Sequence, residues 1–252
     1  MGTLAHIYRH PIKAHGAERV ETVTLTANAT LPWDRVWALV HERSHVDGSK
    51  WERSGNFSRG ATSPSLMAIT CTFDEASEKL TLSPPRLPTL TVNPDRNGEE
   101  IIEWVRAIMP PEGRASARVI RAGSAAQGQG MTDNAEPYLS LLGLSSLRAL
   151  SGKAGRDLSP LRFRGNLWVD GLGPWEEFEW VGKSIRIGAA EFSVEDRIDR
   201  CPATMVNPDT GRRDTDTLDL LREGWGHIDF GVFARVTKAG PIAIGDPVEV
   251  IG

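Results

Sequence analysis

One of the two cysteines of this 252-residue chain, Cys201, has the residue context of a reactive thiol. It follows Arg197 and Arg200 and precedes the turn-forming segment Asn207-Pro-Asp-Thr-Gly211. Positive neighbours favour the thiolate, which is both the nucleophile and the soft metal ligand. A free cysteine is most often a buried structural residue, but charged residues and a turn make a poor core. We therefore interpret Cys201 as functional, and Cys71, in an alternating strand pattern, as core.

The segment Arg162-Phe-Arg-Gly-Asn166 is a compact set of anion and amide donors. On a strand, alternation would place Arg162, Arg164 and Asn166 on one face. Two guanidiniums and an amide on one face are costly unless an anion or an acidic partner compensates them. Arginine forks match the geometry of phosphate, which favours an anionic ligand. The alternative is a surface face of salt bridges.

Four further polar residues stand beside predicted helices and strands. Asp133 and Asn134 precede a helix predicted over residues 137–142, where they would act as caps. A helix N-terminus also offers free backbone N–H groups to a phosphate or a polar heterocycle. Lys13, in His10-Pro-Ile-Lys13, and Arg35, in Asp34-Arg35, flank strand patterns. Taken alone, each of these residues would be read as a cap or a surface charge.

Short β-branched and apolar runs, separated by Gly, Pro, Asn and Asp, dominate both ends of the chain and predict strands. The predicted strands are residues 3–9, 18–26, 35–41, 65–73, 79–83, 115–121, 166–169, 184–187, 190–194, 231–236 and 247–251. Apolar residues at helical spacing predict helices over residues 99–109, 137–142, 145–151 and 215–223. The sequence thus predicts a mainly β fold (α+β), built around a barrel with a few short helices.

The prolines and glycine of residues 84–98 interrupt the strand pattern and predict a boundary. We expect an N-terminal β region over residues 1–95 and a second domain over residues 99–252. Residues 45–63 are polar and contain three glycines, which predicts a long loop.

Composition and motifs exclude several classes of protein. The net charge of −4 argues against a nucleic-acid partner, and no apolar run is long enough to span a membrane. The N-terminus lacks the apolar region of a signal peptide, so we expect a cytoplasmic protein. Neither cysteine belongs to a Cys/His cluster, which disfavours structural zinc and an internal iron–sulfur cluster. No dinucleotide fingerprint, Walker loop or nucleophile elbow is present.

Six motifs, in order along nearly the whole chain, resemble those of the MOSC domain, the C-terminal module of molybdenum cofactor sulfurases. In this chain an N-terminal MOSC-type β region precedes the domain. With this arrangement, the chain is similar to bacterial relatives of the mitochondrial amidoxime-reducing component. The motifs are His10-Pro-Ile-Lys13, Asp34-Arg-Val-Trp37, Asp133-Asn-Ala-Glu-Pro137, Arg162-Phe-Arg-Gly-Asn166, the segment from Cys201 to Gly211, and the segment from Gly231 to Asp246.

The resemblance implies binding of molybdenum cofactor (molybdopterin), a pterin dithiolene that carries a phosphate. Cys201 would ligate molybdenum as the catalytic thiolate. Lys13, Arg35 and Arg164 would neutralise the phosphate and bind the pterin, while Asp133, Asn134 and Asn166 would read the donors and acceptors of the pterin. The full set of implied cofactor-binding residues is Lys13, Arg35, Asp133, Asn134, Arg162, Arg164, Asn166 and Arg200.

The implied reaction is the reduction of a small molecule, an N-hydroxylated or N-oxide compound, by removal of oxygen at molybdenum. Because no ferredoxin domain is fused to the chain, electrons would come from a separate donor protein of the ferredoxin or flavin-reductase type. Two alternatives remain open. Cys201 could carry a persulfide in a sulfur-transfer module, or the barrel could bind an anionic ligand with Cys201 inert.

Overall fold

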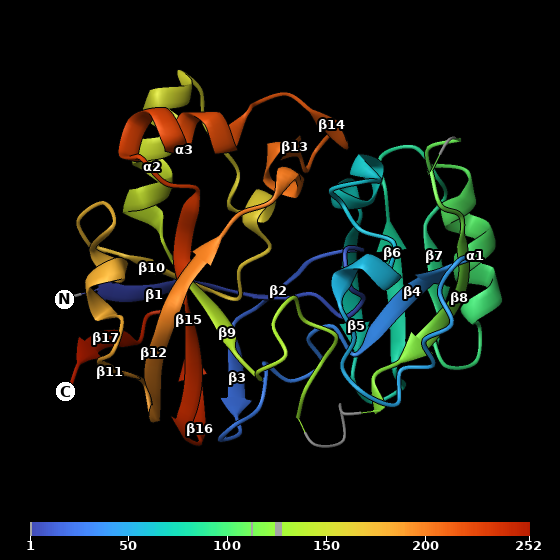
Figure 1. The fold of residues 1–252 in the computed structure, drawn as a ribbon. Helices are drawn as coiled ribbons and strands as arrows, with labels where there is room; N and C mark the ends of the chain where they lie inside the picture. Colours follow the sequence, from blue (N-terminus) through green and yellow to red (C-terminus); the bar gives the residue numbers. More distant parts are fainter. Residues whose placement is uncertain (1, 112, 124–127) are drawn as a thin grey trace.

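The computed structural model describes residues 2–111, 113–123 and 128–252, and the fold is mainly β, as the strand patterns predict. Its largest part is a sheet that closes into a seven-stranded barrel, because β1 pairs both with β17 and with β10 (Figure 1). An eighth strand of this sheet, β2 (Glu18–Val20), pairs with the end of β1. Around the barrel the strands follow in the order β10 (Leu167–Asp170), β9 (Leu139–Gly143), β15 (Asp229–Lys238), β12 (Ala190–Asp199), β11 (Ser184–Ile187), β17 (Pro247–Val250) and β1 (Gly2–Arg9).

The barrel closes around alternate side chains of its strands. In β12 the buried residues Phe192 and Val194 alternate with partly exposed ones, and in β15 Val232 and Ala234 do the same. Successive side chains of a strand point to opposite faces, so such strands present one face to the barrel interior. Leu4 of β1 belongs to this same core, which makes the first strand of the chain part of the C-terminal barrel.

Beside the barrel lies a second body, which we call the side lobe (Figure 1, right). It contains the pair β4 (Trp37–His41) and β8 (Ser116–Arg121), the sheet β5 (Thr70–Asp74), β6 (Lys79–Ser83) and β7 (Leu90–Val92), and helix α1 (Gly98–Arg106). The helix buries Ile101, Ile102 and Val105, whose spacing predicts it, against the core that also contains Trp37. The short β7 follows Pro88 and is not predicted by the sequence pattern.

The chain crosses from the barrel to the side lobe directly after β1. Ile12 packs in the side-lobe core, and the backbone N–H of Lys13 donates a 2.8 Å hydrogen bond to the carbonyl of Trp37. Residues 10–16 are therefore held by both bodies at once.

A separate two-stranded sheet pairs β3 (Thr22–Leu25) with β16 (Gly240–Ala243). The sequence pattern does not predict β16.

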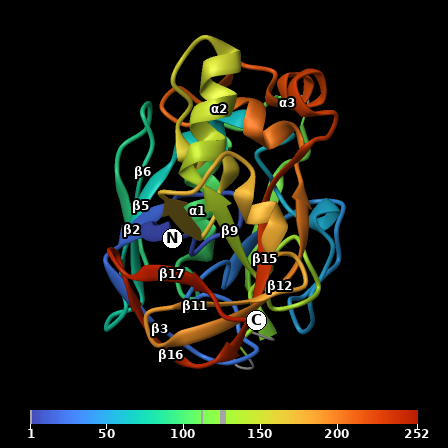
Figure 2. The ribbon, with the colours of Figure 1, turned by 90° about the vertical axis from the view of Figure 1, so that its left-hand side faces the viewer.

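Helices α2 (Leu144–Ala154) and α3 (Thr217–Trp225) correspond to the helices predicted over residues 145–151 and 215–223. They pack together at one end of the barrel (Figure 2). The 3-10 helix Pro202–Met205 contacts α3 and leads into the hairpin of β13 (Val206–Asn207) and β14 (Arg212–Arg213). In the part of the chain that the structure describes, none of the helices has the length and apolarity that crossing a membrane requires.

The helix predicted over residues 137–142 is wrong, because residues Leu139–Gly143 form β9. This strand pairs with β10 on one side and β15 on the other, and Leu139, Leu141 and Leu142 are fully buried. A short, continuous apolar run fits a buried strand or a helix equally well by periodicity. Pairing with two neighbours in the closed barrel stabilises the strand. Asp133 and Asn134 therefore cap no helix.

The strand face predicted for Arg162, Arg164 and Asn166 is also wrong. Residues Pro160–Phe163 form a 3-10 helix that Ser159 caps by accepting the Leu161 N–H, and Arg164 follows with a left-handed φ of +48°. Gly165 then approaches Leu142 so closely that a Cβ would lie 2.3 Å from a Leu142 methyl carbon. The turn therefore sends the three side chains in different directions.

Candidate functional site

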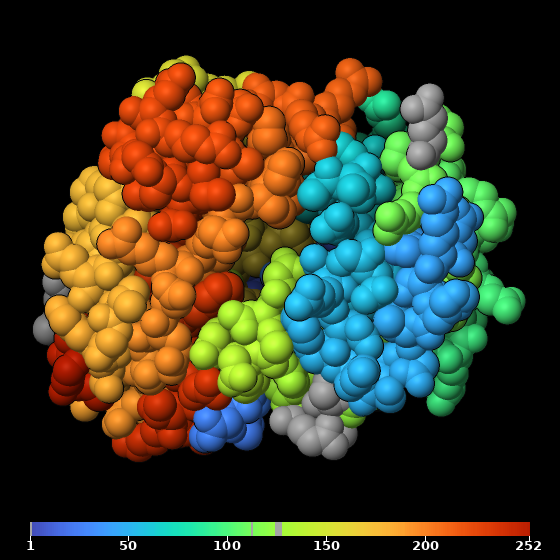
Figure 3. Space-filling model, viewed as in Figure 1, coloured from blue at the N-terminus to red at the C-terminus, as the bar shows by residue number. Residues whose placement is uncertain are grey.

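A cleft lies between the barrel and the side lobe (Figure 3). Its rim in this view is formed by segments coloured orange (near residue 200), lime green (near residue 130) and cyan (near residue 55), and olive and dark blue segments are visible at its floor. The residues that meet at this junction come from the crossing segment after β1, from the approach to β4, from the segment before β9 and from the turn before β10.

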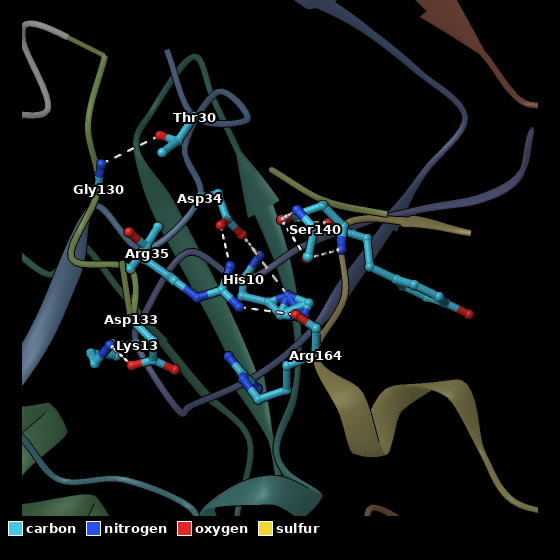
Figure 4. Close-up of polar contacts among 12 residues, drawn as sticks. His10, Lys13, Thr30, Asp34, Arg35, Gly130, Asp133, Ser140 and Arg164 are labelled. Carbon is cyan, nitrogen blue, oxygen red and sulfur yellow. Dashed lines mark hydrogen bonds and ion pairs between the residues drawn. The ribbon is translucent and has the colours of Figure 1, made fainter. Parts of the chain in front are cut away.

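Lys13 and Asp133 form an ion pair at the junction (Figure 4). Lys13 Nζ donates to Asp133 Oδ1 at 2.6 Å and to the carbonyl of Met131 at 2.8 Å. Burial lowers the pKa of the Lys13 ammonium, and Asp133 opposes this effect. In turn, Lys13 lowers the pKa of Asp133 to about 2. The Asp133 carboxylate is 73% exposed, so it meets solvent in the cleft while the lysine beneath it does not.

Arg35 and Arg164 face the same junction. Arg35 Nη2 donates to the carbonyl of Arg164 at 2.9 Å, and Arg35 Nη1 pairs with the buried carboxylate of Asp34. The Arg164 guanidinium donates to the carbonyls of Gly16, at 3.0 Å, and Ile12, at 3.4 Å. Burial, followed by repulsion from Arg35, lowers the pKa of Arg164 to about 9. We call Lys13, Arg35 and Arg164 the cationic cluster.

Two fully buried histidines lie beside the cationic cluster. His15 Nδ1 contacts the Lys13 carbonyl at 2.7 Å, so we assign the proton to Nδ1, and burial lowers the pKa of the ring to about 4. Burial, Arg164 and Arg35 together hold the pKa of His10 well below its usual value. Within the described residues, both ring nitrogens of His10 and Nε2 of His15 lack a hydrogen-bond partner. Unsatisfied buried polar atoms are uncommon and call for an explanation.

The backbone is strained at this same junction. Ala14, Arg35 and Arg164 have φ values of +65°, +54° and +48°, a region that residues other than glycine rarely adopt. Each such residue costs about 1 kcal/mol or more, and the strain persists only where the surroundings enforce it. Segments distant in the sequence therefore hold the cationic cluster in place against a local preference.

Cys201 lies just beyond the end of β12 and is exposed. The neighbouring Arg200 points inward, where Nε donates to the carbonyl of Phe230 at 2.8 Å and Nη1 to that of Phe163 at 3.1 Å. Burial lowers the pKa of Arg200 to about 10, an effect that the charges of Cys201 and Asp133 oppose. Arg200 thus ties the Cys201 loop to the turn that carries Arg164 and brings a fixed positive charge beside the thiol.

The remaining predicted site residues have other surroundings. Arg162 is 2% exposed and pairs with Asp214 at 2.7 Å, on the loop that follows Cys201. Asn166 is buried: its Oδ1 accepts from Ser140, and its Nδ2 donates to the Tyr8 carbonyl at 3.2 Å. The Asn134 side chain accepts the Glu136 N–H in a local turn. These three residues do not join the cationic cluster.

Sequence reasoning did not single out His10, His15 or Trp51. Trp51 Nε1 donates to the Thr132 carbonyl at 3.0 Å, which joins the loop of residues 45–63 to the segment that carries Asp133. The two histidines stand next to Lys13 in the sequence, within and just after its motif, so their position was the available signal. For Trp51 no local signal exists, because its partner is distant in the chain.

Fold and site together define a closed β-barrel whose cationic cleft is completed by a second β lobe. Two family models match this organisation: the MOSC N-terminal beta barrel domain over residues 1–105 and the MOSC domain over residues 128–249. The chain therefore belongs to the MOSC-domain proteins, and the resemblance drawn from its motifs is confirmed.

Its relatives include two kinds of protein. Mitochondrial amidoxime-reducing component 1 of Mus musculus is 25% identical over 100% of this chain and 83% of its own length. Molybdenum cofactor sulfurases of Drosophila grimshawi and Anopheles gambiae are 33% and 31% identical, over 44% and 54% of this chain. The chain spans only 15% and 19% of the length of those two sulfurases. Among solved structures, the YUAD protein from Bacillus subtilis gives a TM-score of 0.47 at 12% identity, over 99% of this chain and 96% of that one.

Proposed function

We propose that this protein binds molybdenum cofactor in the cleft and reduces small N-hydroxylated or N-oxide compounds, with electrons from a separate donor protein of the ferredoxin or flavin-reductase type. The observation that carries the proposal is the convergence of Lys13, Arg35 and Arg164 beside the segment that Arg200 fixes next to Cys201. The relation to an amidoxime-reducing component over the whole chain supports the redox direction.

The residues of the cleft fit the chemistry of such a cofactor. Three cations meet there, and burial lowers the pKa of two of them, Lys13 and Arg164, so an anionic phosphate would stabilise their charged forms. The buried nitrogens of His10 and His15 that lack a hydrogen-bond partner within the described residues belong to the same region. The cofactor brings its own dithiolene sulfurs, so one exposed thiolate, that of Cys201, suffices as the protein ligand.

The proposed roles follow from the contacts of each residue. The cationic cluster binds the phosphate and the pterin, and Asp133 and Asn134, in the solvent-facing segment beside Lys13, bind pterin donors. Arg200 positions the Cys201 loop through two backbone carbonyls. Arg162 and Asn166 have side-chain atoms engaged inside the protein, so we give them a positioning role: Arg162 holds the loop after Cys201, and Asn166 joins β1 to the start of β9.

The metal would supply the two-electron chemistry, and the protein would supply binding, orientation and electrostatics. Removal of the oxygen as water consumes two electrons and two protons. The cationic cluster holds the anionic end of the cofactor at the junction, while Cys201, exposed on its loop, remains accessible to a small molecule and to a docking donor protein.

The test is to produce the protein in a host that makes the cofactor and to measure molybdenum and pterin per chain. We expect near-equimolar content in the wild type and a large loss in Lys13→Met. Lys183→Met, which removes an exposed lysine away from the cleft, is the matched control and should retain the content. Wild-type protein without pterin from such a host would overturn the proposal.

A sulfur-transfer function is the second candidate, favoured by the exposure of Cys201 and by the kinship with molybdenum cofactor sulfurases. In this function Cys201 would carry a persulfide. Protein that lacks molybdenum but releases thiocyanate on treatment with cyanide, with the release lost in Cys201→Ala, would favour it over the reductase.

A further inference from the structure

A second pocket, of about 490 Å³, lies where the side lobe meets β14. Its walls come from four separate parts of the chain: the end of β4, the loop of residues 55–63, the segment just before β8, and the β13–β14 hairpin. Arg59, Arg114 and Arg213 contribute one guanidinium from each of the last three parts, and His41 of β4 contributes an imidazole. A volume of this size suits a small organic ligand, since ligand pockets are roughly 300–1,000 Å³.

The three arginines lack carboxylate partners. None of the described residues that line the pocket is acidic, and none of the three guanidiniums forms an ion pair with a described residue. Arg213 donates to the carbonyl of Ala61, and the Arg59 side chain makes no hydrogen bond within the described chain. Three like charges around one pocket repel each other, which favours occupation by an anion.

The Arg114 guanidinium has fewer hydrogen-bond acceptors than its short contacts suggest. Its Nη1 lies 3.1 Å from His41 Nε2 and 3.5 Å from the carbonyl of Gly55. However, His41 Nδ1 accepts the backbone N–H of Arg43, so we assign the ring proton to Nε2, which donates to Gly55 at 2.9 Å. A protonated nitrogen cannot accept from Arg114. This guanidinium therefore keeps donors available to a ligand.

We propose that this pocket is a binding site for a small organic phosphate, separate from the cleft. Arginine forks match phosphate oxygens in a bidentate manner, and a dianion balances three guanidiniums better than a single carboxylate does. The pocket exceeds the size of a phosphate alone, and Phe57 and Ala61 in its wall offer contacts to an apolar or planar group.

The wall of this pocket is shared with the neighbourhood of the cleft. Phe57 lines the pocket, and Lys13 Nζ lies 5.9 Å from the centre of its ring. Gly60, the next residue after Arg59, is packed so that a Cβ there would lie 3.6 Å from Ala203 Cβ, on the Cys201 loop. A ligand in the pocket would therefore fix the loop that faces both Lys13 and the Cys201 loop.

Calorimetric titration of the full chain, purified from the host that makes the cofactor, with adenosine monophosphate and with inorganic phosphate tests the site. We expect saturable binding, tighter for the nucleotide than for phosphate and weaker at high salt. Arg59→Ala and Arg114→Ala should each weaken nucleotide binding roughly ten- to a hundredfold. Arg212→Ala, which removes an exposed arginine of the same hairpin that does not line the pocket, should bind as the wild type does.

Circular dichroism of each variant checks that loss of binding is not loss of fold, and Arg59→Lys, which keeps the charge, provides a second variant. Partial binding by Arg59→Lys supports the proposal. Absence of saturable binding of both probes to the wild type at millimolar concentration would overturn it. Equal weakening by Arg212→Ala would overturn it as well, because the effect would then reflect general surface charge.

Discussion

Arg35 donates a 2.9 Å hydrogen bond from Nη2 to the carbonyl oxygen of Arg164, and both residues have left-handed backbone conformations. The contact joins the approach to β4, in the side lobe, to the turn before β10, in the barrel. It also brings two guanidiniums close enough for Arg35 to contribute to the lowered pKa of Arg164. Two strained residues of like charge in contact lower the stability of the fold. Such strain is typical of a functional site, which is consistent with ligand binding here.

Cys201→Ser should abolish reduction of hydroxylamine-type substrates while leaving the fold intact, because an oxygen ligand is harder than a thiolate and the residue is exposed. Turnover with a chemical reductant and thermal unfolding are the two measurements. Cys71→Ser should give the opposite profile, with lower stability and retained activity, because Cys71 is buried beside Gly16. Activity of Cys201→Ser at the wild-type rate would rule out the ligand role.

Arg164→Ala should weaken retention of the cofactor by roughly ten- to a hundredfold, the value of one charge-assisted hydrogen bond to an anion. Pterin content after dialysis measures the effect. Arg19→Ala, at a residue that is half-exposed and pairs with the neighbouring Glu21, should have little effect. Full pterin content in Arg164→Ala would show that the arginine has a structural role instead.

The backbone strain at Arg164 predicts a difference between two variants that lack the same guanidinium. Arg164→Gly should be more stable than Arg164→Ala by roughly 0.5–1 kcal/mol, because glycine adopts a φ of +48° freely and this gain exceeds its larger unfolded-state entropy. Urea unfolding of the two variants side by side gives the comparison. An alanine variant as stable as the glycine variant would mean that the turn relaxes when the side chain is lost.

The buried His15 predicts acid sensitivity. Its pKa is lowered from 6.5 to about 4, so between these values the unfolded chain binds a proton that the folded chain does not. Stability should therefore fall as the pH drops from 6.5 to about 4, by about 3 kcal/mol from this residue alone. His15→Asn should flatten the dependence of unfolding free energy on pH over this range, whereas His45→Asn, at an exposed position, should not. An unchanged slope in His15→Asn would contradict the assignment.

The sequence predicted the secondary structure correctly where local side-chain spacing determines it. It was misleading where pairing with distant strands determines it. The helical spacing of Ile101, Ile102 and Val105 predicts α1, and the alternation in β12 and β15 predicts barrel strands. By contrast, the run that forms β9 reads equally as helix or strand, and only its two neighbours in the barrel settle it.

The same distinction holds for the site. Motifs pointed to Lys13, Arg35 and Arg164 as one group, and the structure brings these three residues together. The alternation of Arg162, Arg164 and Asn166 suggested a common face, but the capped 3-10 turn and the left-handed Arg164 separate them. The role of Asp214 as the partner of Arg162 could not be read locally, because these residues are distant in the sequence.

The closure of the barrel by its first strand has a consequence for synthesis. Gly2 pairs with Val248, and Ile7 with Leu167, so β1 leaves the ribosome long before either partner exists. Until then β2 can pair only with the end of β1, at residues 7–9, and the edges that β10 and β17 will cover stay open. Open strand edges are prone to aggregation, and contacts this remote form late. We therefore expect the barrel to close only after translation is almost finished, and slow synthesis to raise the dependence of this protein on chaperones.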